Sequence, residues 1–156
     1  MKEEFADLIV QHKALIYKVS KLYTNTLEDE QDLFQEIVFQ LWKSYSIFKG
    51  EAKITTWMYR VGMNTAIASL NKKKRAVSTI TPIEIPDVID DNSTQVQENI
   101  DALYKAIKRL NVIDRGVTLL FLEGNSYKQI GEIMGYTENN VGTRMGRIRE
   151  KLKQLM

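Results

Sequence analysis

The chain has 156 residues, of which 44% are hydrophobic and 27% charged, with eight Gly, two Pro and no Cys. This composition excludes a collagen, a wholly disordered chain and a disulfide scaffold. The lack of cysteine also excludes thiol nucleophiles and Cys-ligated metals. It suits a reducing, cytoplasmic location. The single histidine, His12, cannot form a His-rich metal site. We therefore expect no catalytic residues, no metal and no cofactor, and the longest apolar run, Leu119 to Leu122, is too short to span a membrane.

The formal net charge of +2 conceals an uneven distribution along the chain. Residues 1–75 carry a net charge of +3, residues 76–101 a net charge of −6, and residues 102–156 a net charge of +5. Both prolines, Pro82 and Pro86, fall in the acidic segment. A polar, Pro-containing stretch of about 20 residues is longer than an ordinary loop. We expect two domains, 1–75 and 98–156, joined by a flexible acidic linker at 76–97.

The N-terminal segment contains three helical patterns. The first apolar face consists of Phe5, Leu8, Ile9, Ile16, Val19, Leu22 and Tyr23. The second follows an acidic start at 28–32 and consists of Leu33, Phe34, Ile37, Val38, Leu41, Trp42 and Tyr45. We expect the third helix to begin near Thr55 or Thr56, a plausible N-cap, after a break at 48–51.

The C-terminal segment predicts three or four more helices. Residues 97–110 are amphipathic, residues 113–122 are more uniformly apolar, and Gly124-Asn125 should end the second of these helices. No strand alternation of useful length occurs in the sequence. The predicted fold class is therefore all-α, with two small helical domains.

Residues 126–152 have the pattern of a helix-turn-helix. Ser126 and Thr137 can cap two successive helices, Gly135 suits the turn between them, and Gly131 is small enough for the second helix to cross closely over it. In the second helix Val141, Met145, Ile148, Leu152 and Leu155 repeat at helical spacing. Such a unit seats its second helix in the major groove of DNA.

The opposite face of that second helix carries Asn139, Asn140, Thr143, Arg144 and Arg147. Asn can bond adenine, Arg can bond guanine, and the Thr methyl can meet a thymine methyl, so this face favours direct base readout. The alternative is that its arginines only solvate an ordinary helical hairpin. Gly142 and Gly146 weaken the helix, each by about 1 kcal/mol relative to Ala. They either allow close approach to DNA or a partner, or are simply tolerated.

The third N-terminal helix is basic and aromatic. Residues 54–75 carry five positive charges, four of them in the run 72–75, and no negative charge. Cations follow phosphates and aromatic rings stack on unpaired bases, so this helix suits a single strand. Core packing of Trp57 and solvation of the lysine run are the alternatives.

Three motifs together resemble a known family. The segment DLFQEIVFQLW at 32–42, the Trp-Met-Tyr-Arg block at 57–60 followed by Asn64, and the C-terminal helix-turn-helix resemble the small sigma factors of bacterial RNA polymerase, of the extracytoplasmic-function (ECF) type in the sigma-70 family. The resemblance covers nearly the whole chain in the right order. Gly131, where Ala is usual, and Gly142 and Gly146 depart from the family pattern.

The resemblance implies a role for each motif. Asp32, Gln35, Glu36 and Gln40 would contact the clamp helices of the polymerase beta-prime subunit, although the acidic run alone would be read as a solvated face. The loop 48–53 would capture a flipped base of the minus-ten element. Candidate residues for that element are Phe48, Lys49, Lys53, Trp57, Arg60 and Asn64.

The resemblance also assigns partners to the C-terminal half. Asn139, Asn140, Thr143, Arg144 and Arg147 would read the minus-thirty-five element as duplex, and another surface would meet the beta flap. The linker would thread toward the active-site channel. Whether an anti-sigma factor controls the chain is left open by the sequence.

Two other classes of protein compete with this interpretation. A free-standing helix-turn-helix regulator would have an N-terminal domain that binds a ligand or dimerises, but such a domain has no reason to carry the basic, aromatic helix at 54–75. An enzyme is disfavoured by the single histidine, the absence of cysteine and the absence of a phosphate-binding glycine loop or an HExxH motif.

Overall fold

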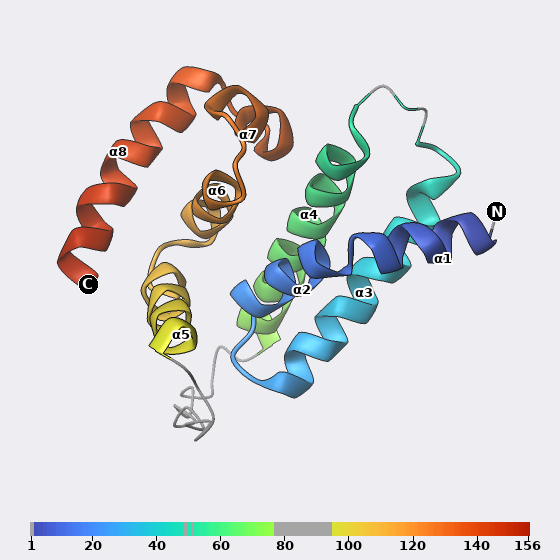
Figure 1. Ribbon diagram of the computed structural model, residues 1–156, viewed down its shortest axis with the longest axis horizontal. Coiled ribbons are helices and arrows are strands. Elements are labelled where there is room, and N and C mark those ends of the chain that lie inside the picture. Colours follow the sequence, from blue (N-terminus) through green and yellow to red (C-terminus); the bar gives the residue numbers. More distant parts are fainter. Residues whose placement is uncertain (1, 49, 51, 77–94) are drawn as a thin grey trace.

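The computed structural model describes residues 2–48, 50, 52–76 and 95–156, and within these ranges the chain forms helices and no strands. The predicted all-α class is confirmed. Figure 1 shows α1–α4 grouped on one side and α5–α8 on the other. Most of the predicted linker at 76–97 lies outside the described residues.

The N-terminal group contains four helices rather than three. They are α1 (Lys2–Gln11), α2 (Lys13–Leu22), α3 (Leu27–Tyr45) and α4 (Ile54–Ala76). The single apolar face predicted from Phe5 to Tyr23 is divided at His12, which lies between α1 and α2. Thr26 caps α3 by accepting a hydrogen bond from the Asp29 N–H. The start of α4 was predicted one or two residues too late.

The C-terminal group contains α5 (Gln95–Lys108), α6 (Val112–Leu122), α7 (Tyr127–Met134) and α8 (Glu138–Leu155). Asn111 caps α6 through the Asp114 N–H. Gly124, with φ of +91°, follows α6, as the stop signal predicted. Because α5 begins at Gln95, the helical part of the C-terminal group starts three residues before the predicted boundary at 98.

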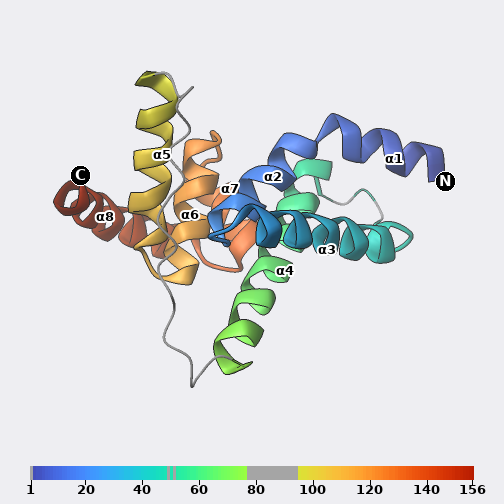
Figure 2. The same cartoon turned by 90° about the horizontal axis from the view of Figure 1, so that it is seen from below.

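The two groups of helices share one hydrophobic core. The largest of its fully buried side chains come from both halves of the chain: Ile16, Val19, Leu22, Ile37, Leu41, Met58, Met63, Ile107, Val117, Leu120, Ile130 and Ile148. Helix α4 packs against α7, and α2 packs against α5 and α6 (Figure 2). At Gly116 of α6 an added Cβ would lie 2.9 Å from the hydroxyl of Tyr23, the residue that follows α2, so this glycine leaves room for the Tyr23 side chain against α6.

Candidate nucleic-acid interface

Helices α7 and α8 form the predicted helix-turn-helix. Ser126 and Gln129 form a reciprocal capping box at the start of α7, and the Thr137 side chain accepts from the Asn140 N–H at the start of α8. Gly135 has a φ of +83°, and its N–H donates to the Gly131 carbonyl, which closes the turn. The sequence therefore predicted the two caps and the turn correctly.

The role of Gly131 differs from the one predicted for it. The atom that approaches it most closely is the Tyr136 carbonyl oxygen in the turn, which would lie 2.4 Å from an added Cβ. The close contact at Gly131 is therefore with the turn rather than with the crossing helix α8.

The outer face of α8 presents four of the five predicted base-reading residues to solvent. Asn139, Asn140, Thr143 and Arg147 are exposed, and the buried side of the same helix carries Val141, Met145 and Ile148. The Thr143 hydroxyl donates to the Asn139 carbonyl, so its methyl group is the part left free for an apolar contact. This face has donors, acceptors and a methyl group available for a DNA groove.

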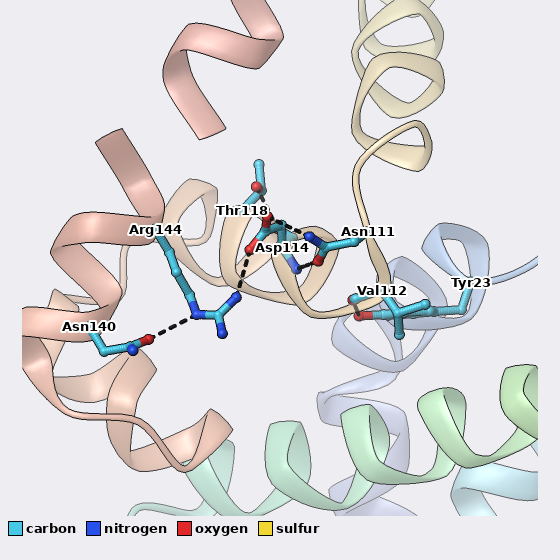
Figure 3. Close-up of polar contacts among 7 residues, drawn as sticks. All are labelled: Tyr23, Asn111, Val112, Asp114, Thr118, Asn140 and Arg144. Atoms are coloured by element: carbon cyan, nitrogen blue, oxygen red, sulfur yellow. Dashed lines mark hydrogen bonds and ion pairs between the residues drawn. The ribbon is translucent and has the colours of Figure 1, made fainter. Parts of the chain in front are cut away.

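The fifth residue, Arg144, is held by its own domain (Figure 3). Its Nη1 lies 3.2 Å from Asp114 Oδ1 on α6, and its Nε donates to Asn140 Oδ1 at 2.8 Å. The guanidinium also lies over the Tyr136 ring, 4.5 Å from the ring centroid. Only 21% of the Arg144 side chain is exposed, so the structure separates it from the four residues of the open face.

In the N-terminal domain the aromatic candidates pack on each other. The rings of Phe48 and Trp57 stack with centroids 4.9 Å apart, and Tyr45 lies 6.3 Å from Trp57. Trp57 is only 8% exposed, which matches the core alternative for this side chain. Lys49, another candidate, lies outside the described residues.

The other three candidates for the minus-ten element lie in two hollows. Lys53 and Arg60 border a hollow between α4 and α7, opposite Gln129 and Glu132. There the Arg60 Nη2 donates to the Glu132 carbonyl at 2.8 Å. Asn64 is exposed but borders a different hollow, between α3 and α4, together with Asp32, Glu36 and Gln40. The structure therefore does not bring all the strand-binding candidates together.

Helix α3 carries the residues predicted to contact polymerase. Asp32, Gln35 and Glu36 are exposed, and the amide of Gln40 donates to the Glu36 carboxylate at 3.0 Å. Beside Gln35 the residues Phe39 and Trp42 are 51% and 40% exposed. This apolar neighbour of the acidic face was missed, because the sequence pattern assigned Trp42 to the core and did not use Phe39.

A polar interface joins the two domains, and sequence reasoning did not predict it. The Tyr23 hydroxyl donates to the Val112 carbonyl at 2.9 Å, and Lys18 Nζ lies 2.9 Å from Glu123 Oε1.

Burial raises the pKa of Tyr23, and burial together with the Glu123 carboxylate raises the pKa of Tyr59 to about 12. Burial likewise raises the pKa of Tyr104. The buried phenols therefore favour their neutral form.

The described ranges contain neither a metal site nor a membrane-spanning helix. No group of His, Asp or Glu side chains there could hold a metal ion. None of the described helices is long and apolar enough to cross a membrane.

An exposed polar face on the second helix of a helix-turn-helix, next to a basic helical domain, defines a two-domain DNA-binding protein. A model of sigma-70 region 2 matches residues 8–76, and a model of sigma-70 region 4 matches residues 100–152. The chain belongs to the sigma-70 family, in its ECF group, and acts as a promoter-directing subunit for core RNA polymerase.

Two relatives have modest sequence identity to this chain and align with it over most of their length. The ECF RNA polymerase sigma factor SigM of Mycobacterium tuberculosis is 26% identical over 153 residues, which covers 97% of this chain and 76% of that protein. The ECF RNA polymerase sigma factor SigW of Bacillus subtilis is 24% identical over 166 residues, which covers 98% of this chain and 89% of that protein.

Two solved structures have a similar fold. One is the sigma factor RpoE in complex with the anti-sigma factor NepR from Bartonella quintana, with a TM-score of 0.82, 18% identity and coverage of 98% of this chain and 96% of that one. The other is CnrH in complex with the cytosolic domain of CnrY, with a TM-score of 0.72, 17% identity and coverage of 99% and 88%.

Proposed function

We propose that the two domains divide promoter recognition between them, with no catalytic chemistry of their own. The domain at 98–156 reads the minus-thirty-five element as duplex DNA through the outer face of α8. The observation that carries this proposal is the exposure of Asn139, Asn140, Thr143 and Arg147 on one face of a helix whose opposite face is buried. A recognition helix needs this combination, because the buried face fixes the orientation in which the polar face enters the groove.

The domain at 1–75 binds the melted minus-ten strand. Lys53 and Arg60 supply cations for the phosphates, and α4 has no acidic side chain along its length. Phe48 and Trp57 can stack on bases only if the packed aromatic pair separates, because Trp57 is buried beneath Phe48 and Tyr45. Capture of an extruded base offsets part of the cost of unpairing, which is about a few kcal/mol.

The exposed face of α3 contacts the beta-prime clamp helices through Asp32, Gln35, Glu36 and Gln40, while the C-terminal domain meets the beta flap. The exposed rings of Phe39 and Trp42 extend this contact with apolar area. The protein works in the cytoplasm, where polymerase and promoter DNA are found. The structural neighbour RpoE was solved in complex with the anti-sigma factor NepR, and we propose an anti-sigma protein as a regulator of this chain as well.

Reconstitution with core polymerase tests the proposal directly. The protein is added to core enzyme on a library of genomic promoter fragments, and the transcript start sites are sequenced. We expect starts at a fixed distance from shared upstream elements only when the protein is present. Efficient specific initiation by core enzyme alone, or tight sequence-specific duplex binding without polymerase, would contradict it, and the second result would favour a free-standing regulator.

A further inference from the structure

A chain of polar contacts connects the start of α6 to the outer face of α8. Asn111 Nδ2 donates to Asp114 Oδ2 at 2.9 Å, and the other oxygen of the same carboxylate lies 3.2 Å from Arg144 Nη1. Arg144 Nε then donates to Asn140 Oδ1 at 2.8 Å. Figure 3 shows these four side chains in sequence between the two helices. The exposed amide of Asn140 is therefore linked to a carboxylate that lies outside the recognition helix.

We infer that Arg144 is a positioning residue that fixes the orientation of Asn140 for base readout, rather than a base reader itself. This inference rests on the proposed function of α8. A guanidinium can only donate hydrogen bonds, so the atom of the Asn140 amide that faces it must be the oxygen. The amide nitrogen is then directed elsewhere. A carbonyl oxygen accepts two hydrogen bonds, so Oδ1 can still accept one from adenine while Nδ2 donates to the same base.

The surroundings of Arg144 explain why it would stay in place when DNA binds. The exposed fractions of the Arg144 and Asp114 side chains are 21% and 16%, so both charges are largely removed from solvent. Turning Arg144 toward a base would leave the Asp114 carboxylate partly buried without its cation, which is unfavourable. The Tyr136 ring beneath the guanidinium further restricts its movement.

Base preference in the holoenzyme tests the inference. The protein is combined with core polymerase, the minus-thirty-five element of a promoter is randomised, and the transcribed templates are sequenced. The variants are Asn140→Ala, Asp114→Asn, Arg144→Gln, Arg144→Lys and the double variant Asp114→Asn/Arg144→Gln. Lys153→Gln is the matched control, because it also removes a cation of α8 that pairs with a carboxylate, but the pair is exposed on the helix surface.

We expect Asp114→Asn and Arg144→Gln to lose about tenfold in discrimination at the same base position as Asn140→Ala, the loss expected of one bidentate pair. The double variant should lose no more than Arg144→Gln alone. Arg144→Lys should fail to restore the preference, since an ammonium keeps the charge but cannot bond Asp114 and Asn140 in two fixed directions. Lys153→Gln should keep the wild-type preference at every position.

The opposite pattern would overturn the inference. If Arg144 reads a base, Arg144→Gln should change the base preference at a position where Asn140→Ala leaves the preference intact. Asp114→Asn should then keep the wild-type preference at every position. If Arg144 contacts a phosphate, Arg144→Lys should recover wild-type behaviour. Thermal unfolding identifies a variant that fails to fold. In that case the comparison of Arg144→Gln with Arg144→Lys decides whether Arg144 positions Asn140 or only supplies a charge. If the wild-type protein gives no promoter-selective transcription, the proposed function itself fails.

Discussion

Arg60 on α4 donates a hydrogen bond from Nη2 to the backbone carbonyl of Glu132 on α7, across 2.8 Å. A side chain proposed to bind the minus-ten strand is thus held by the domain proposed to read the minus-thirty-five element. The two elements are about 25 base pairs apart, or about 85 Å of duplex at about 3.4 Å per base pair. A compact chain of this size has a radius of gyration of about 15 Å. If the two domains have these proposed roles, the packed arrangement is too short to reach both elements, and we expect the interface to open on the promoter.

Reversing one charge in this interface should favour the open arrangement. In the wild type, Lys18 Nζ lies 2.9 Å from Glu123 Oε1. Lys18→Glu would replace this ion pair with two carboxylates that face each other. We expect a destabilisation of about 1 kcal/mol or less, because Lys18 is partly exposed and water screens the pair. Small-angle X-ray scattering at low salt should show a larger radius of gyration than for the wild type. Lys13→Glu, an exposed position on the same helix, is the control. An unchanged radius for Lys18→Glu would mean that the apolar contacts and the remaining hydrogen bonds, such as that from Tyr23 to Val112, are sufficient to hold the domains together.

Alkaline pH should weaken the fold through the buried phenols. Burial raises the pKa of Tyr59 to about 12, against an ordinary value of 10.0, so the folded state favours the neutral phenol. The stability that this provides is present below pH 10 and is lost as pH rises from 10 to 12. The loss is about 2 to 3 kcal/mol for two pKa units. Denaturant unfolding at a series of pH values measures it. Tyr59→Phe should reduce the decline, and Tyr17→Phe, at an exposed position, should not.

Gly131→Ala should destabilise the helix-turn-helix. The new Cβ would lie 2.4 Å from the Tyr136 carbonyl oxygen, and this neighbour is backbone, which cannot move aside by a side-chain rotation. We expect a loss of about 1 to 3 kcal/mol, as is usual for overpacking. Denaturant unfolding monitored by circular dichroism provides the measurement. Stability equal to the wild type would show that the turn at Gly135 and Tyr136 shifts freely.

The sequence was sufficient for those features that depend on neighbouring residues. The caps at Ser126 and Thr137 and the turn at Gly135 were predicted because each involves backbone groups no more than four residues away. The break at His12 was missed, since the apolar spacing continues across it and no Gly or Pro marks it.

The features that were not predicted depend on residues far apart in the sequence. The sequence predicts Arg144 as a base reader because its helical position is on the polar side, and only the fold reveals that Asp114, 30 positions earlier, pairs with it. Tyr23 and Val112 are 89 positions apart, and the acceptor is a backbone carbonyl, which no residue type reveals. The domain interface therefore had no signature in the sequence.

Gly146→Ala should raise stability and lower promoter affinity. No atom lies within 4 Å of an added Cβ at Gly146, so Ala fits, and it should favour the helix by up to about 1 kcal/mol. Gly146 borders an exposed hollow on α8 together with Thr143 and Arg147, both proposed to read DNA. A methyl group there should hold the helix away from the groove. Unfolding and holoenzyme binding to the minus-thirty-five element measure the two effects. If stability rises and affinity is unchanged, the glycine is merely tolerated.

Arg147→Ala separates base readout from phosphate binding on α8. Arg147 is exposed and lies on the same face as Thr143, one helical turn further along. If it contacts a base, we expect its loss to cost about 1 to 3 kcal/mol and to relax preference at one position of the minus-thirty-five element. Transcription by the holoenzyme from promoters that differ at single positions measures this change. A uniform loss of affinity across all sequences, with a shallower salt dependence, would instead identify a phosphate contact. Each phosphate contact contributes about one to the slope of log affinity against log salt concentration, and the substitution would remove that contribution.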